Sequence, residues 1–162
     1  SSTYNKEWEN LCKNSALGDK ILLFDRFSNQ KEIAKLIQIS DCGIFPSSAE
    51  GWNMPLLECM SIGKRVIASN VSAHTQYCTN INSLLIDFTE IELAYDGCFF
   101  KGEIGNWHKF GSDQEEQLIN HMRNIHKRKQ NGEDLTNKPG IETSLKFSWK
   151  NTADKIIEAI NA

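Results

Sequence analysis

The chain has 162 residues, 40% of them hydrophobic and 24% charged, and its 18 Lys and Arg against 21 Asp and Glu give a net charge of −3. This composition is that of a globular protein and excludes a disordered or collagen-like chain. The acidic balance argues against binding to nucleic acid or to an anionic membrane surface, and no apolar run is long enough to span a bilayer. The length predicts one domain over residues 1–162.

The five cysteines are odd in number, scattered and without a C-x-x-C pair, which is typical of reduced thiols that act as small hydrophobic residues. The chain opens at Ser1 on a polar stretch without a signal-peptide core. Both features predict a cytoplasmic protein. His74 and Cys78 have the i, i+4 spacing of a helical metal pair, but two ligands alone make a poor site, so we expect no metal.

A helix is predicted over residues 5–14, and four apolar runs of strand length follow it. These runs cover residues 21–24, 42–45, 66–68 and 84–86. Helical patterns lie between them: one helix begins after Asn29, and another begins near Pro55 and ends at Gly63. Strands alternating with helices predict an α/β fold, a Rossmann-like parallel sheet flanked by helices.

Residues 88–112 interrupt this alternation. They are rich in glycine and aromatic residues and predict an ordered insertion, either a self-packed loop or a lid over a cleft. Asp113 with Glu116 predicts the start of a helix, and residues 127–140 are expected to form a loop or a frayed helix end. A last helix is predicted to begin at Ser148, with Trp149 and the isoleucines after it packed in the core.

The junction of residues 46–58 is the best candidate for a ligand site, because open parallel sheets bind ligands beyond the carboxyl ends of their strands. The helix that starts near Pro55 offers amides and a positive dipole end to an anion, and Gly51 allows a close approach of the backbone. Glu50 and Glu58 can accept hydrogen bonds from hydroxyl groups, so a phosphorylated sugar or ribose is the expected ligand. The same residues also suit an ordinary helix start, or a general acid and base.

Glu58 follows Glu50 by eight positions, and Pro46-Ser47 precede the pair. This pattern resembles the E-x7-E signature of the retaining group 1 glycosyltransferases of the GT-B fold. Further segments resemble that family in the same order along the chain, namely residues 29–41, 63–69, 82–86 and 147–149. The ordered set extends over most of the chain and is far more specific than the E-x7-E spacing alone.

The chain departs from the family pattern at several positions. Asn53 stands where the family has its second glycine, and Arg65 stands where it has proline. Gln76 replaces the usual glutamate, and Arg26 replaces the glycine before the base-binding turn. The insertion at 88–112 is absent from most members. These departures concern the particular sugar more than the class of enzyme.

The resemblance implies the donor-binding, carboxy-terminal half of a two-domain hexosyltransferase, which moves a sugar from a nucleoside-diphosphate sugar to a glycan or polysaccharide acceptor. Glu58 would hold the ribose hydroxyls, and Glu50, the catalytic position, would hold the hydroxyls of the transferred sugar. Backbone amides near Gly51 would bind the diphosphate, Phe27 and its neighbours would line the nucleobase, and His74 would reach the diphosphate or remain a solvated loop residue. The implied donor-binding residues are Arg26, Phe27, Ser28, Glu50, Gly51, Trp52, Asn53, Met54, Glu58 and His74.

The resemblance also implies parts outside the chain. The family's first strand–helix unit, with the Arg and Lys that clamp the diphosphate, would precede Ser1, and the acceptor would bind a missing amino-terminal domain. We therefore expect weak donor binding and little transfer by the chain alone, and peripheral membrane association of the full enzyme only. No cofactor is expected, since the helix end would stabilise the leaving diphosphate. The alternatives are a GT-B nucleotide-sugar epimerase and a non-catalytic binding module.

Overall fold

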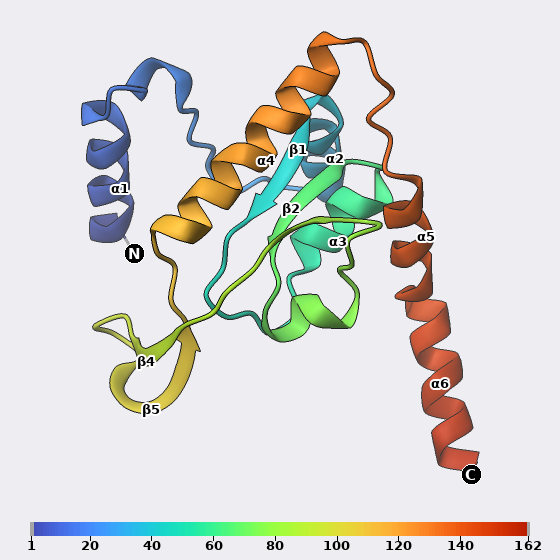
Figure 1. The fold of residues 1–162 in the computed structure, drawn as a ribbon. Coiled ribbons are helices and arrows are strands. Elements are labelled where there is room, and N and C mark those ends of the chain that lie inside the picture. Colours follow the sequence, from blue (N-terminus) through green and yellow to red (C-terminus); the bar gives the residue numbers. More distant parts are fainter. Residues whose placement is uncertain (1, 162) are drawn as a thin grey trace. The chain divides into compact units, whose positions relative to one another are not determined.

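The computed structural model describes residues 2–161 (Figure 1). They form two compact units, which divide between residues 33 and 34. A division by compactness does not decide the number of domains, so the single domain over residues 1–162 stays a prediction.

The first unit begins with α1 (Ser2–Asn14), which confirms the predicted helix, and continues with the short helix η1 (Gly18–Lys20). The predicted strand over residues 21–24 is wrong, because these residues have irregular backbone and Leu22 is 74% exposed. An apolar run forms a buried strand only where a neighbouring strand pairs with its amides and other layers cover its faces. The described part of this unit contains no strand that could do so.

The helix α2 (Gln30–Ile39) starts in the first unit and continues into the second. Its start is the predicted one: the Asn29 side chain Oδ1 accepts a hydrogen bond from the Glu32 amide at 3.2 Å. On the second unit's side, Ile37 packs against the core.

The second unit is built on a parallel sheet in the order β1 (Cys42–Phe45), β2 (Arg65–Ser69), β3 (Leu84–Ile86). Ile44 lies opposite Ile67, and Ile67 lies opposite Leu84. The helix α3 (Met54–Ser61) connects β1 to β2, and the short helix η2 (Ser72–Gln76) lies between β2 and β3. The predicted α/β fold, with a parallel sheet flanked by helices, is confirmed.

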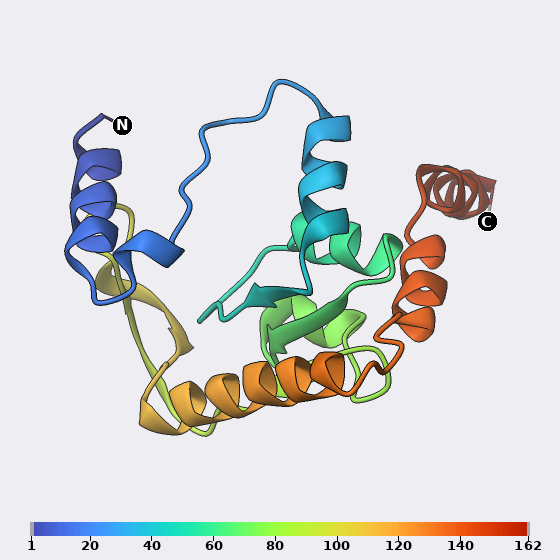
Figure 2. The same ribbon diagram turned by 90° about the horizontal axis from the view of Figure 1, so that it is seen from above.

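The core has two layers because successive side chains of β2 face opposite sides of the sheet. Val66 and Ala68 pack in one cluster with α3 residues such as Leu56, while Ile67 packs in the other with Ile125. Ile125 belongs to α4 (Ser112–Gln130), and Figure 2 shows α3 and α4 on opposite faces of the sheet. The strand β1 lies at the edge of the sheet, so it is less buried than predicted.

The five cysteines are free, and two of them, Cys59 and Cys78, belong to the core. Burial raises the pKa of each of these two thiols to about 11. A thiol with so high a pKa is neutral and unreactive near pH 7, so these two act as the predicted small hydrophobic residues.

The predicted insertion at 88–112 is ordered. Within it, β4 (Ile91–Tyr95) and β5 (Lys101–His108) form an antiparallel hairpin with an irregularity between Leu93 and Tyr95. The Asp96 carboxylate accepts hydrogen bonds at 2.8 Å from the amides of residues 98, 99 and 100 at the hairpin turn. These bonds lower the pKa of Asp96.

The expected loop or frayed helix end over residues 127–140 is confirmed for residues 131–137, which are turn and irregular backbone, whereas the residues on both sides of them are helical. The helix α4 continues to Gln130, and its last turn carries Lys and Arg, which suit the negative end of the helix dipole. A further helix, α5 (Lys138–Lys146), begins at Asn137, whose Oδ1 accepts a hydrogen bond from the Gly140 amide at 3.0 Å. Asparagine followed closely by Pro139 is a helix-start signal that the sequence reasoning missed.

The last helix, α6 (Trp149–Asn161), starts as predicted, since Ser148 Oγ accepts a hydrogen bond from the Asn151 amide at 3.2 Å. Its predicted place in the core is wrong: Trp149 is 86% exposed and Ile160 is 77% exposed. An amphipathic pattern identifies a face that can be buried, not the surface that buries it.

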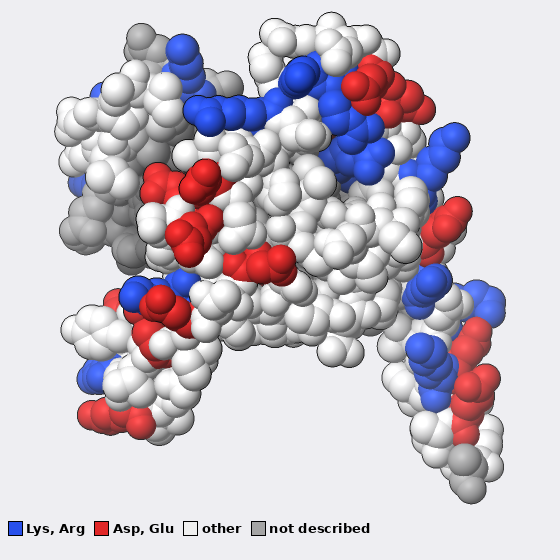
Figure 3. Space-filling view, viewed as in Figure 1, with Lys and Arg blue, Asp and Glu red and all other residues white. Residues whose placement is uncertain are grey.

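No helix among the described residues is long and apolar enough to cross a membrane. On the face seen in Figure 3, basic and acidic side chains lie in small groups of both signs.

Candidate functional site

The predicted ligand site lies at one edge of the parallel sheet, where the loops after β1 and β2 meet. Ser69, at the end of β2, donates a hydrogen bond from its hydroxyl to the Phe45 carbonyl at the end of β1, at 3.5 Å. Asn70 donates its amide hydrogen to the carbonyl of Ile86, at the end of β3, at 2.8 Å. The carboxyl ends of the three strands therefore lie together, which is the position at which open α/β sheets bind ligands.

Glu50 is held in place by two hydrogen bonds to one of its carboxylate oxygens. Its Oε1 accepts from the Ser47 hydroxyl at 2.9 Å and from the Asn53 side-chain amide at 3.2 Å. Among the described residues, no donor contacts the other oxygen, Oε2. The half-buried carboxylate is thus oriented by the protein and keeps an acceptor for a ligand hydroxyl.

Asn53 organises this loop through both its backbone and its side chain. Its backbone is left-handed, with φ 64° and ψ 67°, a conformation that asparagine tolerates better than most residues other than glycine. Its Oδ1 accepts from the Leu56 amide at 3.3 Å and caps α3, while its Nδ2 donates to Glu50 and to His74 Nε2, the latter at 3.0 Å. Asparagine therefore preserves the positive φ available to a glycine and adds three side-chain bonds.

His74 lies in η2 and is completely buried, so the expectation of a solvated loop residue is wrong. Its Nδ1 lies 2.9 Å from the Ser69 carbonyl oxygen. Because a carbonyl only accepts, Nδ1 carries the hydrogen and Nε2 accepts from Asn53. The imidazole is neutral in this arrangement, and both its nitrogens are bonded within the protein. Its direct contact with a diphosphate stays a prediction.

Tyr77 also stabilises the loop that contains Glu50 and Asn53. It was not identified in the sequence analysis. Its hydroxyl donates to the backbone carbonyl of Trp52. The Tyr77 ring packs against the rings of Trp52 and Phe147, with centroids 5.3 Å and 5.8 Å away. Burial raises the pKa of Tyr77 well above its ordinary value, with a further contribution from Cys78 and Glu50, so the hydroxyl remains a donor. An aromatic residue in a loop gives no local signal of such a role.

The start of α3 offers fewer free amides than the sequence suggests. Pro55 has no amide hydrogen, and the Leu56 amide is bonded to Asn53. The exposed loop positions Gly51, Trp52 and Met54 remain beside it, and a Cβ added at Gly51 would meet no atom within 4 Å. Space is therefore available next to the loop backbone.

Glu58 lies in α3, half-buried, and no described residue donates a hydrogen bond to its carboxylate. It is therefore available as an acceptor. The described hydrogen bonds join Glu50, Asn53 and His74 in one network, whereas Glu58 is connected to them only through α3.

The three residues predicted to line the nucleobase belong to the first compact unit. The Phe27 ring lies 5.7 Å from that of Phe24. Ser28 donates from its amide and its hydroxyl to Glu32 Oε2, at 3.3 Å and 3.2 Å, next to the start of α2. Arg26 is exposed. Their contact with a nucleobase stays a prediction.

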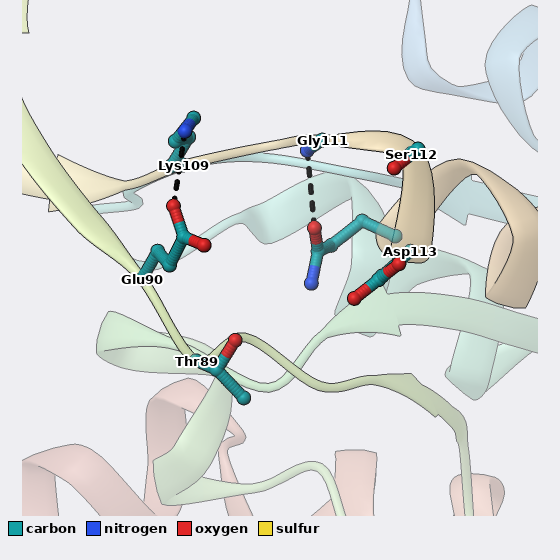
Figure 4. A pocket seen from close by; sticks show the side chains of 7 residues that line it. Thr89, Glu90, Lys109, Gly111, Ser112 and Asp113 are labelled. Atoms are coloured by element: carbon teal, nitrogen blue, oxygen red, sulfur yellow. Dashed lines mark hydrogen bonds and ion pairs between the residues drawn. The ribbon is translucent and has the colours of Figure 1, made fainter.

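A pocket of about 250 Å³ lies at the base of the β4–β5 hairpin, beside the start of α4 (Figure 4). Lys109 Nζ and Glu90 Oε2 pair across it at 2.9 Å, and the Gly111 amide donates to Gln114 Oε1 at 3.0 Å. These polar groups bond to one another, and the Lys109–Glu90 pair joins the two ends of the hairpin.

Among the described residues, no group of three or more His, Cys, Asp or Glu side chains is arranged to hold a metal ion. The sequence profile of the family described as Glycosyl transferases group 1 matches residues 1–97, which is more than half of the chain. The matched range contains Glu50, Asn53, Glu58 and His74. No curated protein sequence is significantly similar to the chain.

Proposed function

The chain belongs to the group 1 glycosyltransferases, and from this we propose that it forms the donor-binding domain of a retaining hexosyltransferase of the GT-B fold. It would bind a nucleoside-diphosphate sugar at the carboxyl edge of β1, β2 and β3. An amino-terminal domain would hold the glycan or polysaccharide acceptor, as in polysaccharide biosynthesis. The free cysteines suit a reducing, cytoplasmic compartment.

The observation that carries this proposal is the fixed carboxylate of Glu50. Ser47 and Asn53 orient one oxygen and leave the other for a hydroxyl of the transferred sugar. A carboxylate that is already oriented loses little conformational entropy when it binds, and this is the kind of preorganisation on which transfer reactions depend. Glu50 is accordingly the residue that we assign to the reacting sugar.

The remaining donor contacts follow from the same loop and helix. Glu58, free to accept, would hold the ribose hydroxyls. The loop amides near Gly51 and Met54, at the positive end of α3, would bind the diphosphate without a metal. His74 would contribute through Asn53, since both its nitrogens are already bonded.

The test is thermal unfolding of the whole chain with excess UDP, GDP, ADP and their sugars. Ligand at about 100 times its dissociation constant adds about 2.7 kcal/mol of stability, which raises Tm by roughly 5–10 °C for a domain of this size. Glu58→Ala should abolish the shift. Glu158→Ala, at an exposed position in α6, is the matched control and should keep it.

A shift with one nucleotide that is lost only in Glu58→Ala supports a working donor site and identifies its base. No shift with any nucleotide contradicts donor binding by this chain and favours a binding module that has kept the fold. A nucleotide-sugar epimerase would show the same binding, and it is distinguished by formation of the epimer without an acceptor.

A further inference from the structure

A second, larger pocket lies between the loop of Glu50 and the β4–β5 hairpin. Its volume is about 560 Å³, within the range of sites that bind small ligands. One wall is the loop from Ser48 to Gly51, and the other is the hairpin with Phe100, Asn106 and Trp107. The His108 amide donates to the Ser48 carbonyl at 3.0 Å and fixes the hairpin beside the loop.

The hairpin wall combines apolar and polar groups. The rings of Phe100 and Trp107 lie with their centroids 5.9 Å apart at an angle of 60°, and Phe100 is 46% exposed. The indole of Trp107 is oriented by a hydrogen bond from its Nε1 to Glu92 Oε1 at 3.1 Å. The polar residues that line the pocket are Asn106 on the hairpin side and Ser48 and Glu50 on the loop side.

This combination matches the chemistry of a pyranose ring. The C–H faces of such a ring are apolar and pack on aromatic side chains, whereas its hydroxyls lie around the rim and need donors and acceptors. A charged or purely apolar ligand would leave one half of this wall unused. The pocket is therefore suited to a neutral sugar.

We propose that this pocket binds the terminal pyranose of the acceptor glycan, next to Glu50. The assignment rests on the proposed function, because it assumes that the donor approaches Glu50 from α3. The pocket shares Glu50 and Gly51 with the proposed donor site but includes none of Met54, Glu58 or the rest of α3. Donor and acceptor sugars would thus both lie next to Glu50, and the insertion would supply an acceptor subsite within the donor-binding domain.

The test is saturation-transfer NMR of the whole chain with methyl glycosides of common hexoses, without nucleotide. We expect one or more glycosides to bind, Trp107→Ala to weaken that binding by about tenfold or more, and Trp107→Phe to restore most of it. Phe99→Ala is the matched control: this side chain is 88% exposed on the same hairpin and does not line the pocket, so binding should be unchanged.

Binding in Trp107→Ala would also be lost if the hairpin unfolded, so a second variant changes the pocket from the loop side. Gly51→Val adds a branched side chain to a residue that lines the loop side of the pocket, and an added Cβ there meets no atom within 4 Å, so the fold should persist and glycoside binding should weaken. Unchanged glycoside binding in this variant and in Trp107→Ala would overturn the proposal, as would the failure of every glycoside to bind.

A last set of binding measurements distinguishes a pocket for the donor sugar from a pocket for the acceptor sugar. If Trp107→Ala weakens the binding of a nucleoside-diphosphate sugar but not that of the free diphosphate, and free glycosides do not bind, the pocket holds the donor sugar and the acceptor assignment is wrong. Binding of the free nucleoside diphosphate, which requires Glu58 and not Trp107, tests the proposed function separately.

Discussion

The loop of residues 46–54 and the β4–β5 hairpin face each other across one pocket, but they are stabilised in opposite ways. The loop depends on side chains that reach into the protein: Asn53 joins Glu50 to His74, which is 0% exposed. The hairpin depends on its own backbone pairing and on exposed groups such as the Lys109–Glu90 pair at its base.

This difference separates two tasks. Buried, fully satisfied hydrogen bonds fix one geometry, because breaking them exposes polar groups that have no other partner. Exposed pairs contribute little to stability and allow a segment to adjust. Under the function proposed above, the loop would hold the reacting sugar in a fixed position, and the adjustable hairpin would select a second sugar.

The largest loss of stability should result from replacing His74, which lies at the centre of the buried hydrogen-bond network. His74→Ala leaves a cavity and removes one of the two acceptors of Asn53 Nδ2 and the imidazole donor to the Ser69 carbonyl. We expect a loss of about 3 kcal/mol in the free energy of unfolding, measured by urea denaturation, together with weaker nucleotide binding. The control is His126→Ala at an exposed position of α4. If the two variants were equally stable, the network would not be what holds the loop.

Two substitutions at Asn53 distinguish the contribution of its left-handed backbone from that of its side-chain hydrogen bonds. Asn53→Gly and Asn53→Ala both remove the side-chain cap of α3, which costs about 1 kcal/mol for alanine and only about 0.3 kcal/mol for glycine, and both leave His74 Nε2 without its donor. Only alanine is also strained at a φ of 64°. Thermal unfolding should therefore rank wild type above Asn53→Gly, and Asn53→Gly above Asn53→Ala by up to about 1 kcal/mol, since the greater freedom of unfolded glycine offsets part of the strain. An alanine variant as stable as the glycine variant would contradict the left-handed backbone.

The sequence predicts the sheet, and it predicts α3, because there the local signals agree with the packing. Pro55 lies in the first turn of that helix, and Gly63 follows its end with a φ of 79°. The run at 21–24 and the stripe that begins at Trp149 are as apolar as buried elements and yet are exposed, because burial depends on neighbours that no local pattern encodes.

The candidate site likewise has one part that a local sequence pattern reveals and another part that only the fold brings together. The spacing of Glu50 and Glu58 is a local pattern, and it could be recognised in the sequence. The bond between Asn53 and His74 joins residues 21 positions apart and depends on the loops after β1 and β2 meeting at one edge of the sheet. It could be seen only once the strands were placed, as could the pocket between that loop and the hairpin.

The smallest change in stability is expected at the turn of the β4–β5 hairpin, the element that depends on exposed groups. Protonation of Asp96 tests that element. The folded-state pKa of Asp96 lies below the ordinary value of 3.8, so the support that its carboxylate gives to the turn is present above that pH and is lost as the pH falls through the folded pKa. Amide NMR signals of Cys98, Phe99 and Phe100 should shift together below about pH 3.8 and be insensitive to pH in Asp96→Asn. The signal of Leu56, bonded to Asn53, should not follow this titration. A coupled shift at Leu56 would mean that the loop and the hairpin order as one element, and the division between a fixed hold on one sugar and an adjustable wall for another would then fail.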